Sequence, residues 1–168
     1  MTVPQASQEK RDRILLVEDN LYNRELMQDY LQTCFGVGVA AVTEGRQALA
    51  TLSVYHPDLI LLDLKLPDID GFAVLQEMAN RSLQIPVFVV TACARPEDRE
   101  RAMSLGADRY FVKPTCLREL CLAIESVLKQ PTSCSFQNLR LYDAAFLVGT
   151  NPGATLSHRP AFDEENRF

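Results

Sequence analysis

Large apolar residues occur in this chain as short unbroken blocks that stop at polar residues. Residues 59–62 are all large and apolar, and the carboxylate of Asp63 follows them directly. Such a run is typical of a strand buried on both faces, as in a parallel sheet covered by helices. We predict strands over this run and over three others that share the pattern: residues 14–17 before Glu18, residues 87–90 before Thr91 and residues 110–112 before Lys113.

The segments between these runs carry apolar residues at helical spacing. Asn20 is a good N-cap for the first segment, and Gly36 suits its C-terminus. Pro57 requires the second helix to end before it, and Pro96 suits the first turn of the fourth. We predict helices over residues 21–36, 48–52, 72–80, 96–106 and 117–128.

Residues 37–42 are a weaker strand candidate, because Gly38 interrupts the apolar run. With this strand included, five strands alternate with five helices. Such alternation implies parallel strands, right-handed crossovers and helices on both faces, which is an α/β doubly wound fold. The fourth helix has only Ala102, Met103 and Leu105 to bury, so we expect it to be loosely held.

The length of 168 residues and the hydrophobic content of 47% suit one globular domain with additional segments. We expect residues 1–12 to be a flexible leader and residues 13–130 to form the domain. Residues 131–168 would be a mostly irregular or disordered extension, apart from an apolar patch at residues 139–148.

The composition argues against several functions. The net charge of −5 disfavours an unaided nucleic-acid-binding surface. No apolar run approaches the roughly 18 residues that span a bilayer, and the N-terminus lacks a secretory signal, so we expect a cytoplasmic protein with no membrane partner. The cysteines are odd in number and lack CxxC spacing, which favours small free thiols over disulfides or a metal site. They are Cys34, Cys93, Cys116, Cys121 and Cys134.

The polar residues that end the predicted strands are candidates for one functional site. In a parallel sheet of this kind, ligands bind beyond the carboxyl ends of the strands. Glu18, Asp19 and Asp63 would meet there, and three neighbouring carboxylates repel one another unless they bind a cation. Carboxylate oxygens with room for water suit Mg²⁺.

Thr91 and Lys113 would reach the same edge from the fourth and fifth strands. The threonine offers a hydroxyl donor, and the lysine offers a compact positive charge that can hold a phosphoryl oxygen. An aspartate can act as a nucleophile that carries phosphate as an aspartyl-phosphate. Together a cation, a hydroxyl and an ammonium would neutralise the charge that builds on a phosphoryl group during its transfer.

Four stretches of the chain resemble the receiver domain of two-component response regulators. In chain order they are residues 14–20, 61–71, 89–92 and 106–114. The resemblance covers about residues 13–129. It implies a flavodoxin-like (βα)5 fold whose five-stranded parallel sheet has the order 2-1-3-4-5. It also implies a cis bond between Lys113 and Pro114.

The resemblance implies a role for each matching acidic residue. Asp63 would accept a phosphoryl group from a histidine kinase or a histidine phosphotransfer protein. Glu18, Asp19 and Asp63 would hold Mg²⁺, together with the backbone carbonyl of Lys65. We expect the side chain of Lys65 to be solvated rather than to reach toward Glu18 or the phosphate.

The resemblance also implies how a signal leaves the site. Thr91 and Lys113 would bind the phosphoryl group, and Tyr110 would be an aromatic switch that turns inward as Thr91 shifts. A downstream protein effector would read the change on the face built by the fourth helix, the fifth strand and the fifth helix. The same face could also form a homodimer. Direct contact with nucleic acid is not expected.

Two alternative functions remain open. One is a non-phosphorylated pseudo-receiver that only binds proteins, and the other is a receiver fragment of a hybrid histidine kinase. An aspartate-nucleophile phosphatase is disfavoured, because it needs a second acid where this chain has Lys65. We therefore expect a phosphoacceptor rather than an enzyme, with at most slow self-dephosphorylation.

Overall fold

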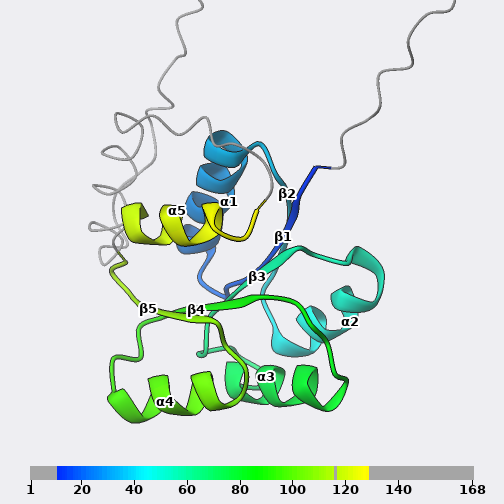
Figure 1. Ribbon diagram of the computed structural model, residues 1–168, viewed down its shortest axis with the longest axis vertical. Helices are drawn as coiled ribbons and strands as arrows, with labels where there is room; N and C mark the ends of the chain where they lie inside the picture. Colours follow the sequence, from blue (N-terminus) through cyan, green and yellow to red (C-terminus); the bar gives the residue numbers. More distant parts are fainter. Residues whose placement is uncertain (1–10, 116, 129–168) are drawn as a thin grey trace, which may run out of the picture.

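The fold is a five-stranded parallel sheet with helices on both faces (Figure 1). The computed structural model describes residues 11–115 and 117–128. Its strands are β1 (Arg13–Val17), β2 (Gly38–Val42), β3 (Leu59–Leu62), β4 (Val87–Thr91) and β5 (Arg109–Val112). Its helices are α1 (Leu21–Phe35), α2 (Gly45–Tyr55), α3 (Gly71–Asn80), α4 (Pro96–Ser104) and α5 (Leu117–Glu125). The strand order β2-β1-β3-β4-β5 confirms the predicted doubly wound fold.

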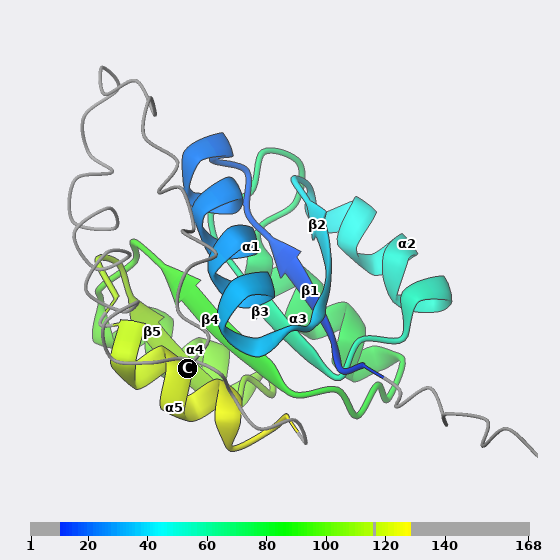
Figure 2. The same cartoon turned by 90° about the horizontal axis from the view of Figure 1, so that it is seen from above.

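Two helical layers bury the two faces of the sheet. Helices α1 and α5 cover one face, and α2, α3 and α4 cover the other (Figures 1 and 2). In β1, Ile14 and Leu16 pack in the first layer while Leu15 and Val17 pack in the second, because successive strand side chains point to opposite faces. Each such side chain stabilises the fold by about 1.5–3 kcal/mol when fully buried. Burial on both faces therefore explains why the apolar runs have no polar break.

Helix α1 begins at Leu21, and Gly36 closes it as predicted. The side chain of Asn20 accepts a hydrogen bond of 3.0 Å from the backbone N–H of Asn23, so it caps the N-terminus. At the other end Gly36 adopts a left-handed conformation with φ of 61°, and its N–H donates to the carbonyl of Gln32. The left-handed conformation is the one that favours glycine at a helix C-terminus.

Helices α4 and α5 are shorter than predicted. Helix α4 ends at Ser104, because Gly106 adopts a φ of 100°, far outside the helical range. Helix α5 ends at Glu125, where two successive N–H groups, at residues 127 and 128, both donate to the carbonyl of Ile124 and form a turn. The apolar spacing continues beyond both ends, and it cannot by itself reveal where the backbone turns.

Helix α4 is anchored by few buried side chains. Among its residues only Asp98 and Ala102 are buried. Met103, which the sequence suggests as an apolar contact, is 42% exposed. The prediction that this helix has few buried apolar side chains is therefore confirmed. Met103, which the sequence predicts to be buried, is exposed instead.

Several predicted features lie outside the described residues. They are the first ten residues of the leader, Cys116, and the extension with its apolar patch and Cys134. Within the described ranges, Cys34 and Cys121 are buried and Cys93 is partly exposed. No helix in these ranges is long and apolar enough to cross a membrane.

Asp68 caps helix α2 from a loop that is distant in sequence. Glu44, which occupies the N-cap position, makes no side-chain cap bond. Instead the Asp68 carboxylate accepts hydrogen bonds from the N–H groups of Gly45 at 2.7 Å and Arg46 at 2.9 Å. Gly45 allows this approach, because a Cβ there would lie 2.5 Å from Cγ1 of Ile69. Asp68 thus ties the loop after β3 to the start of α2, which begins earlier than predicted.

We expect Asp68→Ala to lower the thermal unfolding midpoint by roughly 4 °C, because the start of α2 loses its cap. Glu44→Ala is the matched control and should shift the midpoint by no more than about 1 °C. Thermal unfolding followed by circular dichroism measures both variants. A capping role for Asp68 would be contradicted if the two variants lost the same stability.

Candidate functional site

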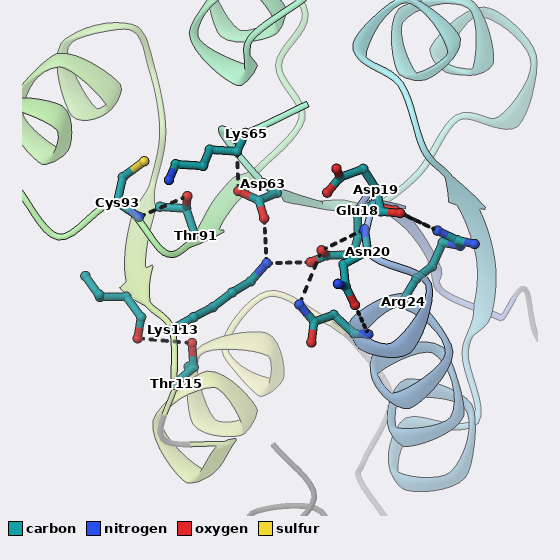
Figure 3. Close-up of polar contacts among 12 residues, drawn as sticks. Glu18, Asp19, Asn20, Arg24, Asp63, Lys65, Thr91, Cys93, Lys113 and Thr115 are labelled. Carbon is teal, nitrogen blue, oxygen red and sulfur yellow. Dashed lines mark hydrogen bonds and ion pairs between the residues drawn. The ribbon is translucent and has the colours of Figure 1, made fainter. Parts of the chain in front are cut away.

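The carboxyl ends of β1, β3, β4 and β5 bring the predicted site residues to one edge of the sheet (Figure 3). Backbone pairing continues beyond the strands and fixes this arrangement. The N–H of Asp63 donates to the carbonyl of Val17 at 3.0 Å, and the N–H of Lys113 donates to the carbonyl of Thr91 at 2.8 Å. The side chains therefore start from positions that the sheet itself determines.

The ammonium of Lys113 is shared by two carboxylates. Its Nζ lies 2.5 Å from Oε2 of Glu18 and 2.6 Å from Oδ2 of Asp63. All three side chains are largely buried, with exposed fractions of 13% for Lys113, 7% for Glu18 and 8% for Asp63. The peptide bond between Lys113 and Pro114 is cis, as the resemblance implies. These groups form an ion triad at the centre of the site.

Burial and charge act in opposite directions on this triad. Burial raises the pKa of Glu18 above its usual value, although the Lys113 charge opposes the shift. Burial alone would lower the pKa of Lys113, but the charges and hydrogen bonds of Glu18 and Asp63 outweigh it and raise that pKa. The ammonium therefore stays protonated and serves as the counter-ion of both acids.

A third carboxylate makes the site suitable for a divalent cation. Glu18, Asp19 and Asp63 each offer a carboxylate oxygen, and these oxygens lie within 4.8 Å of one another. Three carboxylates and one ammonium give the cluster a formal charge of −2. Asp19 is exposed, whereas the other two acids are buried. Hard oxygen donors, one of them open to water, are the donor set that Mg²⁺ prefers.

Side chains from the start of α1 hold the acidic pair in place. The guanidinium of Arg24 donates to the backbone carbonyls of Glu18 at 3.1 Å and Asp19 at 3.2 Å. The Glu18 carboxylate also accepts from the backbone N–H of Asn20 at 3.3 Å and the side-chain amide of Asn23 at 3.5 Å. The sequence does not reveal Arg24 and Asn23 as part of the site, because nothing in their spacing shows that they turn back toward β1.

Lys65 contacts Asp63 through its backbone. Its N–H donates to Oδ1 of Asp63 at 3.0 Å, so both oxygens of this carboxylate accept a hydrogen bond. Its side chain is exposed, and its ammonium points toward the end of β4 that carries Thr91, away from Glu18 (Figure 3). The predicted exposure of the Lys65 side chain to solvent is confirmed, and the absence of a contact with the phosphate stays a prediction.

Thr91 and Tyr110 meet at one residue of the loop after β4. The N–H of Cys93 donates to the hydroxyl of Thr91 at 3.3 Å, and the carbonyl of Cys93 accepts from the hydroxyl of Tyr110 at 2.8 Å. Thr91 is fully buried, and Tyr110 is turned inward with 5% of its surface exposed. Burial, reinforced by the nearby Cys93 and Asp98, raises the pKa of Tyr110 to about 12.

Comparison with solved structures places this fold among receiver domains. The BeF3-activated N-terminal receiver domain of Klebsiella pneumoniae RstA is 26% identical, with a TM-score of 0.66 over 71% of this chain and 100% of that chain. The receiver domain of sensor histidine kinase PA1611 from Pseudomonas aeruginosa is 31% identical, with a TM-score of 0.63 over 70% of this chain and 98% of that chain. The latter structure is described with a magnesium ion coordinated in its active site cleft.

Curated relatives agree with the structural comparison. The transcriptional regulatory protein CiaR of Streptococcus pneumoniae is 40% identical over 141 residues, which cover 83% of this chain and 61% of that protein. The probable transcriptional regulator ycf27 of Porphyridium aerugineum is 34% identical over 129 residues, which cover 77% of this chain and 53% of that protein. This chain thus spans little more than half the length of these relatives.

The family model described as the response regulator receiver domain matches residues 14–125, which include every residue of the site. The chain therefore belongs to the response regulator receiver domain family of two-component systems.

Proposed function

We propose that Asp63 accepts a phosphoryl group from a histidine kinase or a histidine phosphotransfer protein in a Mg²⁺-dependent reaction, and that this modification switches protein contacts. The shared ammonium is the observation that supports the proposal most directly. Lys113 lies 2.6 Å from Oδ2 of Asp63, where it can pair with a phosphoryl oxygen once Asp63 is modified.

In the proposed step, a carboxylate oxygen of Asp63 attacks the phosphorus atom of a donor phosphohistidine. A P–O bond to Asp63 forms while the P–N bond of the donor breaks, and the electron pair of that bond stays on the imidazole. The Lys65 N–H and the Lys113 ammonium orient the two oxygens of Asp63 before attack. After attack, Lys113 exchanges the Asp63 oxygen for a phosphoryl oxygen.

The acidic cluster would hold Mg²⁺ through the carboxylates of Glu18, Asp19 and Asp63 and the backbone carbonyl of Lys65. The formal charge of −2 on the cluster becomes more negative when a phosphoryl group arrives, so the reaction needs added positive charge. A bound Mg²⁺ supplies that charge to the phosphoryl oxygens. Arg24 supports the site by fixing the backbone of the acidic pair.

The proposed switch runs from Thr91 to Tyr110 through Cys93. A phosphoryl group on Asp63 would draw the hydroxyl of Thr91 toward it, and the hydrogen bond to Cys93 would carry the loop after β4 along. The inward orientation of Tyr110 depends on the carbonyl of Cys93 in the same loop. Phosphorylation then shifts the populations of two loop arrangements, because the phosphoryl group on Asp63 interacts more favourably with one of them.

The signal would be read on the face formed by α4, β5 and α5. Met103 in α4 and Leu122 in α5 are 42% and 57% exposed and offer apolar contact area to a protein effector or to a second copy of the chain. The weak anchoring of α4 favours its movement. With a net charge of −5, the chain is proposed to act through protein contacts and not by direct binding to nucleic acid.

A second candidate function is an interaction module that binds proteins without phosphorylation. The inward orientation of Tyr110, held by its hydrogen bond to the carbonyl of Cys93, is compatible with such a module. In either case the chain is proposed to be a phosphoacceptor or binding module rather than an enzyme. Phosphoryl incorporation separates the two candidates.

The full chain incubated with acetyl phosphate and Mg²⁺ should incorporate one phosphoryl group, and Asp63→Asn should incorporate none above background, because it lacks the nucleophile. Phos-tag gel shift and mass spectrometry measure the modification. Asp68→Asn is the matched control, since it changes a nearby exposed aspartate of the same loop and an asparagine can still cap α2. Incorporation that persists in Asp63→Asn would rule out Asp63 as the acceptor.

Asp19→Asn should weaken Mg²⁺ binding by about tenfold or more, because it removes a carboxylate of the cluster. Isothermal titration with MgCl₂ measures the dissociation constant. Asp29→Asn, an exposed aspartate of α1, is the control for the loss of one negative charge. Equal affinities of Asp19→Asn and the control would contradict the assigned metal site.

Tyr110 should lose its proton near pH 12 rather than near pH 10, since burial raises its pKa. The absorbance at 295 nm after a rapid pH jump is measured for the wild type and for Tyr110→Phe. The difference between the two curves isolates the titration of Tyr110 from that of the other tyrosines. Because the folded chain keeps this proton while the unfolded chain loses it, the stability due to Tyr110 should fall as pH rises from 10 to 12. A transition near pH 10 in the difference curve would contradict the inward orientation.

A further inference from the structure

Arg99 of α4 lies on Tyr110 of β5. Its Nη2 donates to the backbone carbonyl of Tyr110 at 2.9 Å, and its Cζ lies 5.2 Å from the centroid of the Tyr110 ring. Arg99 is exposed, whereas Tyr110 is only 5% exposed. The guanidinium therefore covers an otherwise buried ring from the solvent side.

The two contacts of Arg99 respond differently when Tyr110 rotates. The carbonyl of Tyr110 belongs to β5, where the residue pairs with Val89 of β4, so it stays in place while the side chain turns. The observed contact with the ring belongs to its inward orientation. The carbonyl thus anchors a cation where it can attract the inward ring.

We propose that Arg99 is a positioning residue that latches Tyr110 in its inward orientation and so sets the resting balance of the switch. This inference rests on the proposed function, because it assigns a regulator to the same tyrosine. Outward rotation of the ring loses the Arg99 contact as well as the hydrogen bond to Cys93. The latch therefore adds to the energy difference between the two ring orientations.

An arginine suits both contacts at once. Its planar guanidinium can donate to a carbonyl at its edge while its face or rim lies near an aromatic ring, whereas a lysine offers a single point charge. Arg99 also links α4 to β5, and α4 has few buried side chains that hold it to the rest of the domain. The position of α4 therefore determines whether the guanidinium lies over the ring, which couples the face formed by α4, β5 and α5 to the orientation of Tyr110.

The same helix offers a matched control. Arg101 lies two residues further along α4, is also exposed, and places its Cζ 4.1 Å from the centroid of the Phe72 ring in α3. Its replacement removes the same type of side chain and the same type of contact from α4, but at a ring that does not belong to the switch. It separates a specific effect on Tyr110 from general loosening of α4.

The test uses the unphosphorylated full chain labelled with 3-fluorotyrosine. The ¹⁹F resonance of Tyr110 is assigned with Tyr110→Phe, and a soluble gadolinium chelate reports the ratio of exposed to buried ring. Arg99→Ala should raise this ratio about two- to fivefold, the effect of losing an exposed cation–π contact. Arg99→Lys should lie between Arg99→Ala and the wild type, and Arg101→Ala should match the wild type.

An unchanged ratio in Arg99→Ala would overturn the latch, and so would an equal rise in Arg101→Ala. Both results are independent of phosphorylation, since no phosphodonor is present. Failure of the wild type to incorporate phosphate from acetyl phosphate would instead count against the proposed function. The two failures are therefore distinguishable.

Discussion

The site depends on one buried ammonium that two acids share. Lys113 bonds Glu18 and Asp63 across the carboxyl ends of three strands, β1, β3 and β5. Breaking a buried ion pair by removing one partner typically costs about 3–5 kcal/mol, because the other charge is left unpaired. The arrangement is therefore stable only while Lys113 has an anion to bind. A phosphoryl group on Asp63 would satisfy that requirement, which explains how one lysine can serve both the resting and the modified site.

The sheet brings the site residues together at the carboxyl ends of its strands. The apolar runs of β1, β3 and β4 are buried on both faces, so their register cannot slip without exposing apolar residues. Glu18, Asp19 and Asp63 lie within two residues after such a run, and Thr91 ends one. Lys113 directly follows β5. The surrounding loops are then held by polar contacts from other elements, as Arg24 holds the acidic pair and Asp68 holds the start of α2.

The sequence predicted the parts of the structure that depend on local pattern. Apolar runs that end at Asp63 and Lys113 located the sheet edge, and Gly36 located the end of α1. It could not predict contacts between elements that are distant in sequence, such as the bond between Asp68 and Gly45 or the position of Arg99 over Tyr110. An exposed charged residue looks the same in sequence whether it is solvated or reaches a partner.

The most direct test of the central claim is a titration of the ¹⁵N-labelled chain with Mg²⁺ and beryllofluoride, followed by NMR. If Asp63, Thr91 and Lys113 act on one metal and phosphoryl site, amide resonances at the ends of β1, β3, β4 and β5 should shift together and saturate together, with Tyr110 among them. Amide resonances that remain unshifted at these strand ends, while the chain stays folded, would contradict the account.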